Sequence, residues 1–310
     1  MTQTQKDRDA LREWAVFYES GLRRQNSDVN LTQAQIAKDR TRLEADPIEW
    51  IRFFFPEYCK FEFAEFQIKA IRRCIKHEEW FEVLSWARGL AKSTTVMFIV
   101  MYLALTKKKC NVMMASATQD SAVRLLDPYK KQLEENALIR AYYGVQVNLG
   151  NWCAEEFVAK CGCSFRAVGA GNAPRGSRNG AVRPDVLLVD DFDTDEGCRN
   201  PDTIDKNWTW WEKALYGTRD TAVKTLIVFC GNIIARDCCV VRAGHMADHW
   251  DVVNIRDEKG YSTWPSKNTE ESIDIALSKI STAAQQTEYF NNPVTEGEVF
   301  KAVSYTHLRA

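Results

Sequence analysis

The sequence predicts an α/β fold in which a mainly parallel central sheet is flanked by helices. From residue 66 onward, short continuous apolar runs alternate with segments of helical periodicity, a pattern typical of buried parallel strands joined by helices. The first 45 residues are polar, with apolar side chains three and four positions apart, and this spacing predicts an additional N-terminal helical segment.

Two strands and two helices are expected between residues 67 and 116. Residues 67–79 are amphipathic at helical spacing, and 81–86 reads F-E-V-L-S-W, a short strand. The apolar run 96–105 is half the length of about 20 residues that a membrane helix needs. We therefore expect 92–105 to be a core helix and the protein to have no membrane span. A second strand, N-V-M-M-A-S, is expected at 111–116.

The second half repeats the pattern. A helix is expected at 120–136, a hairpin-like region at 153–168, a Gly/Arg-rich loop at 169–183, a buried strand at 186–189, a Trp-rich helix at 205–216 and another buried strand at 225–230. Each strand is a short apolar run, as expected where both faces of a sheet are covered.

Composition excludes a strongly basic nucleic-acid-binding protein. The 310 residues hold 41 Lys and Arg against 42 Asp and Glu, so any contact with DNA must come from a local patch. The ten cysteines show no C-x-x-C spacing, and the first residues are polar and charged rather than a signal peptide. We expect reduced thiols and a cytosolic protein.

A candidate phosphate-binding loop, W-A-R-G-L-A-K-S-T, lies between an expected strand and an expected helix. Amides at the start of such a helix bind phosphate, Lys92 would reach the β- and γ-phosphates, and the Ser93 hydroxyl would hold Mg²⁺. Two glycines of the usual loop are replaced, by Trp86 and Ala91, so a strand-turn-helix without nucleotide is the alternative. The candidate nucleotide-binding residues of the loop are Trp86, Ala87, Arg88, Gly89, Leu90, Ala91, Lys92, Ser93 and Thr94.

An acidic pair follows the expected strand at 186–189. Strand ends are where ligands of open α/β sheets bind, so Asp190 would coordinate Mg²⁺ and Asp191 would polarise the attacking water. A solvated turn is the alternative. Because further acids follow at once, the water-activating group stays open among Asp191, Asp193 and Glu196. Together the loop and the acids predict a P-loop enzyme that uses ATP and Mg²⁺.

The sequence resembles the ATPase domain of phage terminase large subunits over about residues 46–300. The similar segments are the loop with its early arginine, N-V-M-M-A-S-A-T-Q-D-S-A-V-R-L-L, the stretch G-A-G-N-A-P-R-G-S-R-N-G-A-V-R-P-D-V-L-L-V-D-D, T-L-I-V-F-C-G-N and F-A-E-F-Q. The resemblance implies a RecA/ASCE-like P-loop NTPase fold. It also implies that Gln67 recognises adenine and that Asn232 senses the γ-phosphate, although the family often has Gly-Thr at that place.

Three arginines are candidates for stabilising the transition state. Arg88 lies in the loop itself, and Arg175 and Arg178 lie in the Gly/Arg-rich segment. One of them would act as an arginine finger, within the chain or toward a neighbouring subunit. The alternative for the latter two is a solvated loop or a contact with DNA phosphates. The expected catalytic set is therefore Lys92, Asp191, Arg88, Arg175 and Asn232.

The resemblance also implies a domain division and a set of partners. We expect an N-terminal helical segment at 1–45, the ATPase core at 46–255, and a linker or lid at 256–301 that leads toward a nuclease domain missing from this chain. Residues 302–310 are expected to be a non-native tail, and no nuclease activity is expected. The implied role is packaging double-stranded DNA with a portal protein and a small terminase subunit, as a homo-oligomeric ring in the host cytoplasm.

Two rival functions fit part of the same pattern. A superfamily-2-like helicase or translocase shares the glutamine, the loop and the acidic strand, but it should carry a second RecA-like domain. A non-catalytic nucleic-acid-binding scaffold would explain a degenerate loop. Strand separation distinguishes the first rival from a packaging motor, and lack of affinity for Mg-ATP distinguishes the second.

Overall fold

The structure, a computed structural model, describes residues 31–174 and 178–293. In chain order, its elements are α2 (Gln33–Ala45), α3 (Pro47–Phe54), α4 (Glu65–Lys76), β1 (Trp80–Trp86), α5 (Lys92–Leu105), β2 (Asn111–Ser116), α6 (Gln119–Glu135), α7 (Ala137–Tyr143), β3 (Glu156–Val158), β4 (Ser164–Gly169), β5 (Val186–Val189), η2 (Gly197–Arg199), α8 (Pro201–Trp210), η3 (Trp211–Leu215), η4 (Tyr216–Thr218), β6 (Leu226–Cys230), α9 (Cys239–Met246), β7 (His249–Val253), α10 (Glu270–Leu277) and α11 (Thr282–Phe290). The first part of the expected N-terminal segment and the expected tail lie outside the described residues.

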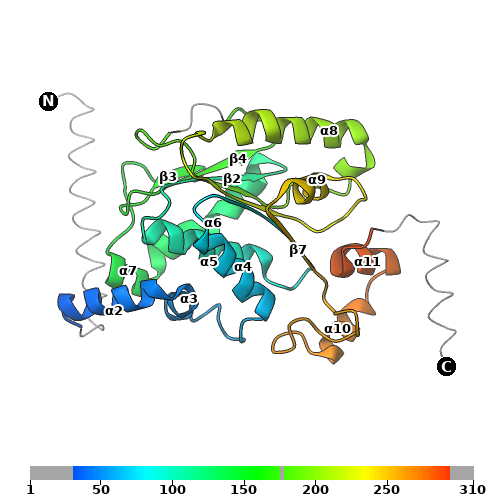
Figure 1. The fold of residues 1–310 in the computed structure, drawn as a ribbon, viewed down its shortest axis with the longest axis horizontal. Helices are drawn as coiled ribbons and strands as arrows, with labels where there is room; N and C mark the ends of the chain where they lie inside the picture. Colours follow the sequence, from blue (N-terminus) through cyan, green and yellow to red (C-terminus); the bar gives the residue numbers. More distant parts are fainter. Residues whose placement is uncertain (1–30, 175–177, 294–310) are drawn as a thin grey trace.

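Seven strands form one sheet in the order β3-β4-β2-β5-β6-β1-β7 (Figure 1). All neighbours pair in parallel except β3 and β4, which form the expected hairpin. Strand β6 lies between β1, which leads into the phosphate loop, and β5, which leads into the acidic pair. The loops after these three strands therefore meet at one edge of the sheet.

Helices cover both faces of the sheet (Figure 1). Alternation along β5 shows how the strands divide between the two layers, because Val186 and Leu188 belong to one buried cluster and Leu187 and Val189 to the other. The larger cluster includes side chains from α2 to α7, and the smaller one includes α8, η3 and α9. The continuous apolar sequences of β5 and β6 follow from this burial on both sides.

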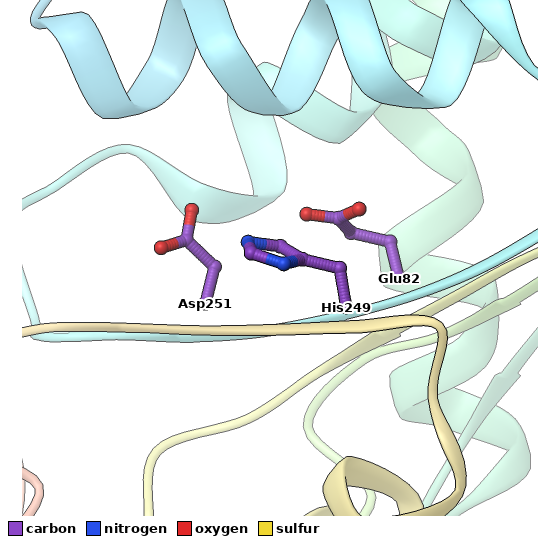
Figure 2. A group of neighbouring side chains, drawn as sticks. All are labelled: Glu82, His249 and Asp251. Carbon is purple, nitrogen blue, oxygen red and sulfur yellow. The ribbon is translucent and has the colours of Figure 1, made fainter.

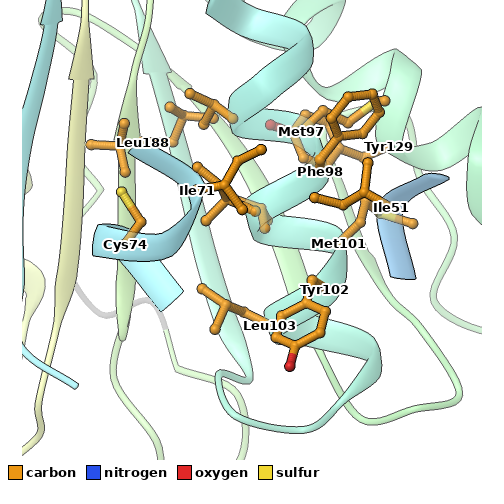
Figure 3. Packing of buried hydrophobic residues seen from close by; sticks show 14 of the residues in the cluster. Ile51, Ile71, Cys74, Met97, Phe98, Met101, Tyr102, Leu103, Tyr129 and Leu188 are labelled. Carbon is orange, nitrogen blue, oxygen red and sulfur yellow. The ribbon is translucent and has the colours of Figure 1, made fainter. Parts of the chain in front are cut away.

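Helix α5 lies in the middle of the larger layer. Its residues from Thr95 to Leu105 are all buried, and Figure 3 shows Met97, Phe98 and Met101 packed among side chains from neighbouring helices. Burial on every side explains why this helix is apolar all round. The expectation of a core helix is confirmed, and none of the described helices combines the length and apolar character needed to span a bilayer.

A polar cluster fixes α4 and the edge strand β7 to β1. Glu82 is fully buried and accepts hydrogen bonds from Arg73 Nε at 3.0 Å and from the Trp80 indole N–H. Arg73 also binds Asp251 at 3.1 Å, and His249 lies between the two acids (Figure 2). These acids and His249 could together hold a cation, but the Arg73 guanidinium already supplies the positive charge. The cluster is therefore an ion-pair network of the fold.

Candidate nucleotide-binding site

The loop between β1 and α5 adopts the bend that a phosphate site requires. Gly89 and Ala91 both have left-handed backbones, with φ of +86° and +58°. Ala91 is the N-cap of α5, so the free amides of the first helical turn point into the loop. Residues of the loop line a cavity of about 780 Å³. The segment predicted from sequence thus forms a bend with free amides beside a cavity, the arrangement that a phosphate-binding loop would need.

Ala91 is strained because a side chain disfavours the left-handed region by roughly 1 kcal/mol. Ala91→Gly is expected to relieve this strain and raise the free energy of unfolding by about 1 kcal/mol. Chemical denaturation measures the change. Ala87→Gly, in the same loop but without a positive φ, is the control and is expected to give no gain. Equal effects of the two substitutions would contradict the strain at Ala91.

The side chains of the loop and of the strand ends contact each other directly. Lys92 Nζ donates to Asn232 Oδ1 at 2.9 Å, and Ser93 Oγ donates to Asp190 Oδ2 at 2.5 Å. These two bonds join the start of α5 to the ends of β6 and β5. The structure therefore brings together Lys92, Ser93, Asp190 and Asn232, four residues that sequence reasoning placed in one site from positions up to 140 residues apart.

Asp190 is held in an environment that disfavours its charge. Burial raises the pKa of its carboxyl to about 6, while the neighbouring Lys92 ammonium and the Ser93 hydroxyl oppose this shift. Its second oxygen accepts the amide of Asp191 at 3.1 Å. A buried carboxylate beside a hydroxyl offers the oxygen ligands that Mg²⁺ prefers, and the donor set fits a divalent cation.

The three candidate water-activating acids occupy different surroundings. Asp191 is exposed, has a left-handed backbone with φ of +48°, and lines the cavity beside Lys92. Asp193 also borders the cavity, but its two carboxylate oxygens accept the amides of Cys239 and Val240 at 2.9 and 2.8 Å, capping α9. Glu196 is exposed outside the cavity lining. Of these three candidates the geometry favours Asp191, because it borders the cavity and does not cap a helix.

Three of the expected nucleotide-binding residues are buried and lie outside the cavity lining. Trp86 and Leu90 are fully buried in the core. Gln67 is also buried, accepting the Ala64 amide at 2.9 Å and donating to the Leu90 carbonyl at 3.2 Å. The Gln67 side-chain amide therefore fixes the phosphate loop through the Leu90 carbonyl. None of the three side chains lines the cavity, so contact of Gln67 with adenine stays a prediction.

Two of the three candidate arginines lie within the described residues, and of these Arg88 lies at the cavity. Its Nε donates to Glu288 Oε2 at 2.7 Å, and this hydrogen bond raises the pKa of the guanidinium. Arg178 is exposed and outside the cavity lining, while Arg175 lies outside the described residues. The choice of an arginine finger thus stays a prediction.

Sequence reasoning missed a group of C-terminal residues that border the site. Lys267 Nζ donates to the Gly89 carbonyl at 2.7 Å, and Glu288 binds Arg88. Asn291, in a left-handed conformation, donates to the Ser85 carbonyl at 2.9 Å and accepts the Ile233 amide at 3.1 Å. No motif marks these residues, because they reach the site only through tertiary packing of the segment treated as a linker or lid.

Comparisons with known proteins support the fold. The sequence matches no protein-family model and no curated protein. The structure is similar to the large terminase of bacteriophage HK97, with a TM-score of 0.55 and 12% identity, covering 81% of this chain and 55% of that one. It also aligns with the ATPase domain of the large terminase of Thermus phage P74-26, with a TM-score of 0.44 and 15% identity, covering 74% of this chain and 94% of that one. The chain spans about half the length of the HK97 protein. The predicted fold class is confirmed: this is an α/β P-loop NTPase fold shared with a phage large terminase.

Proposed function

We propose that this chain is the ATPase motor of a phage terminase large subunit, which hydrolyses ATP to drive double-stranded DNA into a procapsid. The single observation that carries the proposal is the junction of loop and strand ends, in which Lys92 binds Asn232 and Ser93 binds Asp190. A phosphoryl-transfer site needs a cationic cradle, metal ligands and a water-activating acid within one cavity. The shared fold with a large terminase supports the choice of motor.

The residues of the site divide the chemistry among them. The amides of the loop and Lys92 would bind the phosphates, and Lys92 would exchange its bond to Asn232 for one to the γ-phosphate. Ser93 and Asp190 would hold Mg²⁺, which supplies charge neutralisation at the phosphates when bound. Asp191 would orient the attacking water, and Arg88 would neutralise developing charge.

Asn232 links the phosphate site to the rest of the molecule. It lies just after the end of β6, accepts from Lys92 and donates through Nδ2 to the Glu288 carbonyl at 2.9 Å. Loss of the γ-phosphate would return Lys92 to Asn232. This exchange supports a role for Asn232 as the γ-phosphate sensor, and it connects the sensor to α11.

The remaining parts of the proposal rest on the likeness to the HK97 large terminase. Residues 46–255 would form the motor core and 256–301 a lid, with 1–45 as an N-terminal helical segment. Portal protein and small terminase subunit would be the partners of a homo-oligomeric ring that acts in the host cytoplasm. Of these segments, the structure describes residues 31–174 and 178–293.

The test is ATP hydrolysis by the full 310-residue chain with and without linear double-stranded DNA. We expect Mg²⁺-dependent hydrolysis that DNA stimulates, without separation of the strands of a labelled duplex. Strand separation would favour a helicase instead. Lack of any Mg-ATP binding in a fluorescence titration would overturn the enzyme and leave a nucleic-acid-binding scaffold.

A further inference from the structure

The end of α11 contacts the phosphate loop through both main chain and side chain. The Arg88 amide donates to the Glu288 carbonyl at 2.9 Å, and the Arg88 side chain donates to the Glu288 carboxylate at 2.7 Å. The same carbonyl accepts Asn232 Nδ2 at 2.9 Å. Glu288 therefore touches the loop that binds phosphate and the residue that binds Lys92. One residue of α11 is connected to both halves of the site.

The position of the Glu288 carboxylate in α11 is unfavourable for a negative charge. It lies in the last turn of α11, which carries no basic residue, and a negative charge there faces the negative end of the helix dipole. The Glu288 side chain is also only 26% exposed. The charge-assisted hydrogen bond from Arg88 offsets both the helix-dipole repulsion and the partial burial of the carboxylate. The charged form of Glu288 is therefore stabilised by Arg88 in this position.

The Arg88 side chain can also interact with a phosphate bound in the cavity. Its side chain is 67% exposed and borders the same cavity as Lys92 and Ser93, where the proposed γ-phosphate would lie. Pairing with Glu288 offsets part of the guanidinium charge that would otherwise neutralise that phosphate, so a triphosphate and the Glu288 carboxylate compete for Arg88. A diphosphate, which lacks the outermost charge, competes less.

We propose that Glu288 is a positioning residue for Arg88: it holds the guanidinium away from the phosphates until a γ-phosphate competes for it, so that ATP but not ADP releases Arg88, at a cost in ATP affinity. This inference rests on the proposed function, because it requires a nucleotide in the cavity. The main-chain bonds from Arg88 and Asn232 to the Glu288 carbonyl do not depend on the carboxylate. Transfer of the Arg88 guanidinium from Glu288 to a phosphate therefore moves only the Arg88 side chain, and α11 stays attached to the loop.

The test is a double-mutant cycle on the full chain, with Glu288→Gln, Arg88→Ala and the double variant. Glu288→Gln keeps the size of the side chain and removes the competing charge. We expect it to tighten Mg-ATP binding by about two- to fivefold, the range for a partly exposed ion pair, with a smaller change for Mg-ADP. The ratio of the two dissociation constants, from fluorescent-nucleotide titrations, is the readout. In the Arg88→Ala background, Glu288→Gln is expected to leave that ratio unchanged.

Glu271→Gln is the matched control, since Glu271 is exposed in the first turn of α10 and does not line the cavity. It removes the same charge and is expected to leave the ATP/ADP ratio at the wild-type value. An unchanged ratio in Glu288→Gln, with wild-type protein that binds both nucleotides, would overturn this inference alone. A shift that persists in the Arg88→Ala background would also overturn it, because Glu288 would then act without Arg88. Absence of nucleotide binding by the wild type would instead overturn the proposed function, and the inference with it.

Discussion

Lys92→Ala is expected to lower ATP turnover by about a thousandfold, equivalent to ~4 kcal/mol of transition-state stabilisation. Lys92 is the cation at the centre of the loop, and its ammonium now binds Asn232 at 2.9 Å. Alanine removes the charge that would move to the phosphates. Both partners are partly exposed, so water replaces the lost bond and folding is expected to be retained. Steady-state phosphate release measures the activity, and thermal denaturation checks the fold.

The control for this loss is Lys279→Ala, which removes an exposed lysine just beyond α10. It is expected to keep wild-type turnover. Asn232→Ala is informative beside it, because it removes the partner of Lys92 but leaves the charge. We expect a smaller loss than with Lys92→Ala. Turnover that survives Lys92→Ala within about twofold would contradict the assignment of the phosphate site, as the loss of one such donor ordinarily costs far more.

Asp190→Asn is expected to stabilise the metal-free protein while it abolishes Mg²⁺-dependent turnover. Burial raises the pKa of Asp190 from 3.8 to about 6, so the folded state disfavours the carboxylate by up to ~3 kcal/mol at neutral pH. Asparagine keeps the shape and removes the charge. Its amide can donate to Ser93 Oγ and its oxygen can accept the Asp191 amide, so both present bonds have replacements. Loss of a metal ligand explains the loss of activity.

The gain in stability from Asp190→Asn depends on pH. Because the folded pKa lies above the unfolded one, the stabilising contribution of the protonated carboxyl is fully present below about pH 4 and is lost as the pH rises through about 6. Asparagine does not ionise, so its advantage should be absent near pH 4, grow as the pH rises, and be fully present above about pH 6. Chemical denaturation across that interval, in the presence of chelator, measures it. Asp127→Asn, on the exposed side of α6, is the control. A pH-independent effect of Asp190→Asn would contradict the burial of its charge.

The sequence predicts the fold well because its strands are buried on both faces. The expected strands at 81–86, 111–116, 186–189 and 225–230 correspond to β1, β2, β5 and β6, which are mostly apolar and buried. Strand β7 was not predicted. It reads H-W-D-V-V at the edge of the sheet, where polar side chains pair with α4 and an apolar run is not required. The expected helix at 205–216 is instead α8 followed by a π-helical turn, η3.

The site was predictable where chemistry fixes residue type next to an element boundary. Lys92, Ser93 and Asp190 follow strand ends, and the parallel sheet brings such ends together. Burial of Gln67 and the role of Glu288 were not predictable, since both depend on tertiary contacts. The R-P-D stretch that carries part of the resemblance has a structural role at its last residue: Asp185 accepts the amides of Cys110 and Asn111 at 2.9 and 2.8 Å and so fixes the start of β2.

The ion-pair network around Arg73 has a consequence for how the protein behaves at high concentration. Strand β7 ends the sheet, and within the described residues its outer side pairs with no further strand. An open strand edge is a template on which a second chain can add, and charged side chains along such a strand oppose that addition. Asp251, paired with Arg73, puts a charged side chain on this strand. We therefore expect the ion pair that attaches β7 to α4 also to oppose edge-to-edge pairing of two chains.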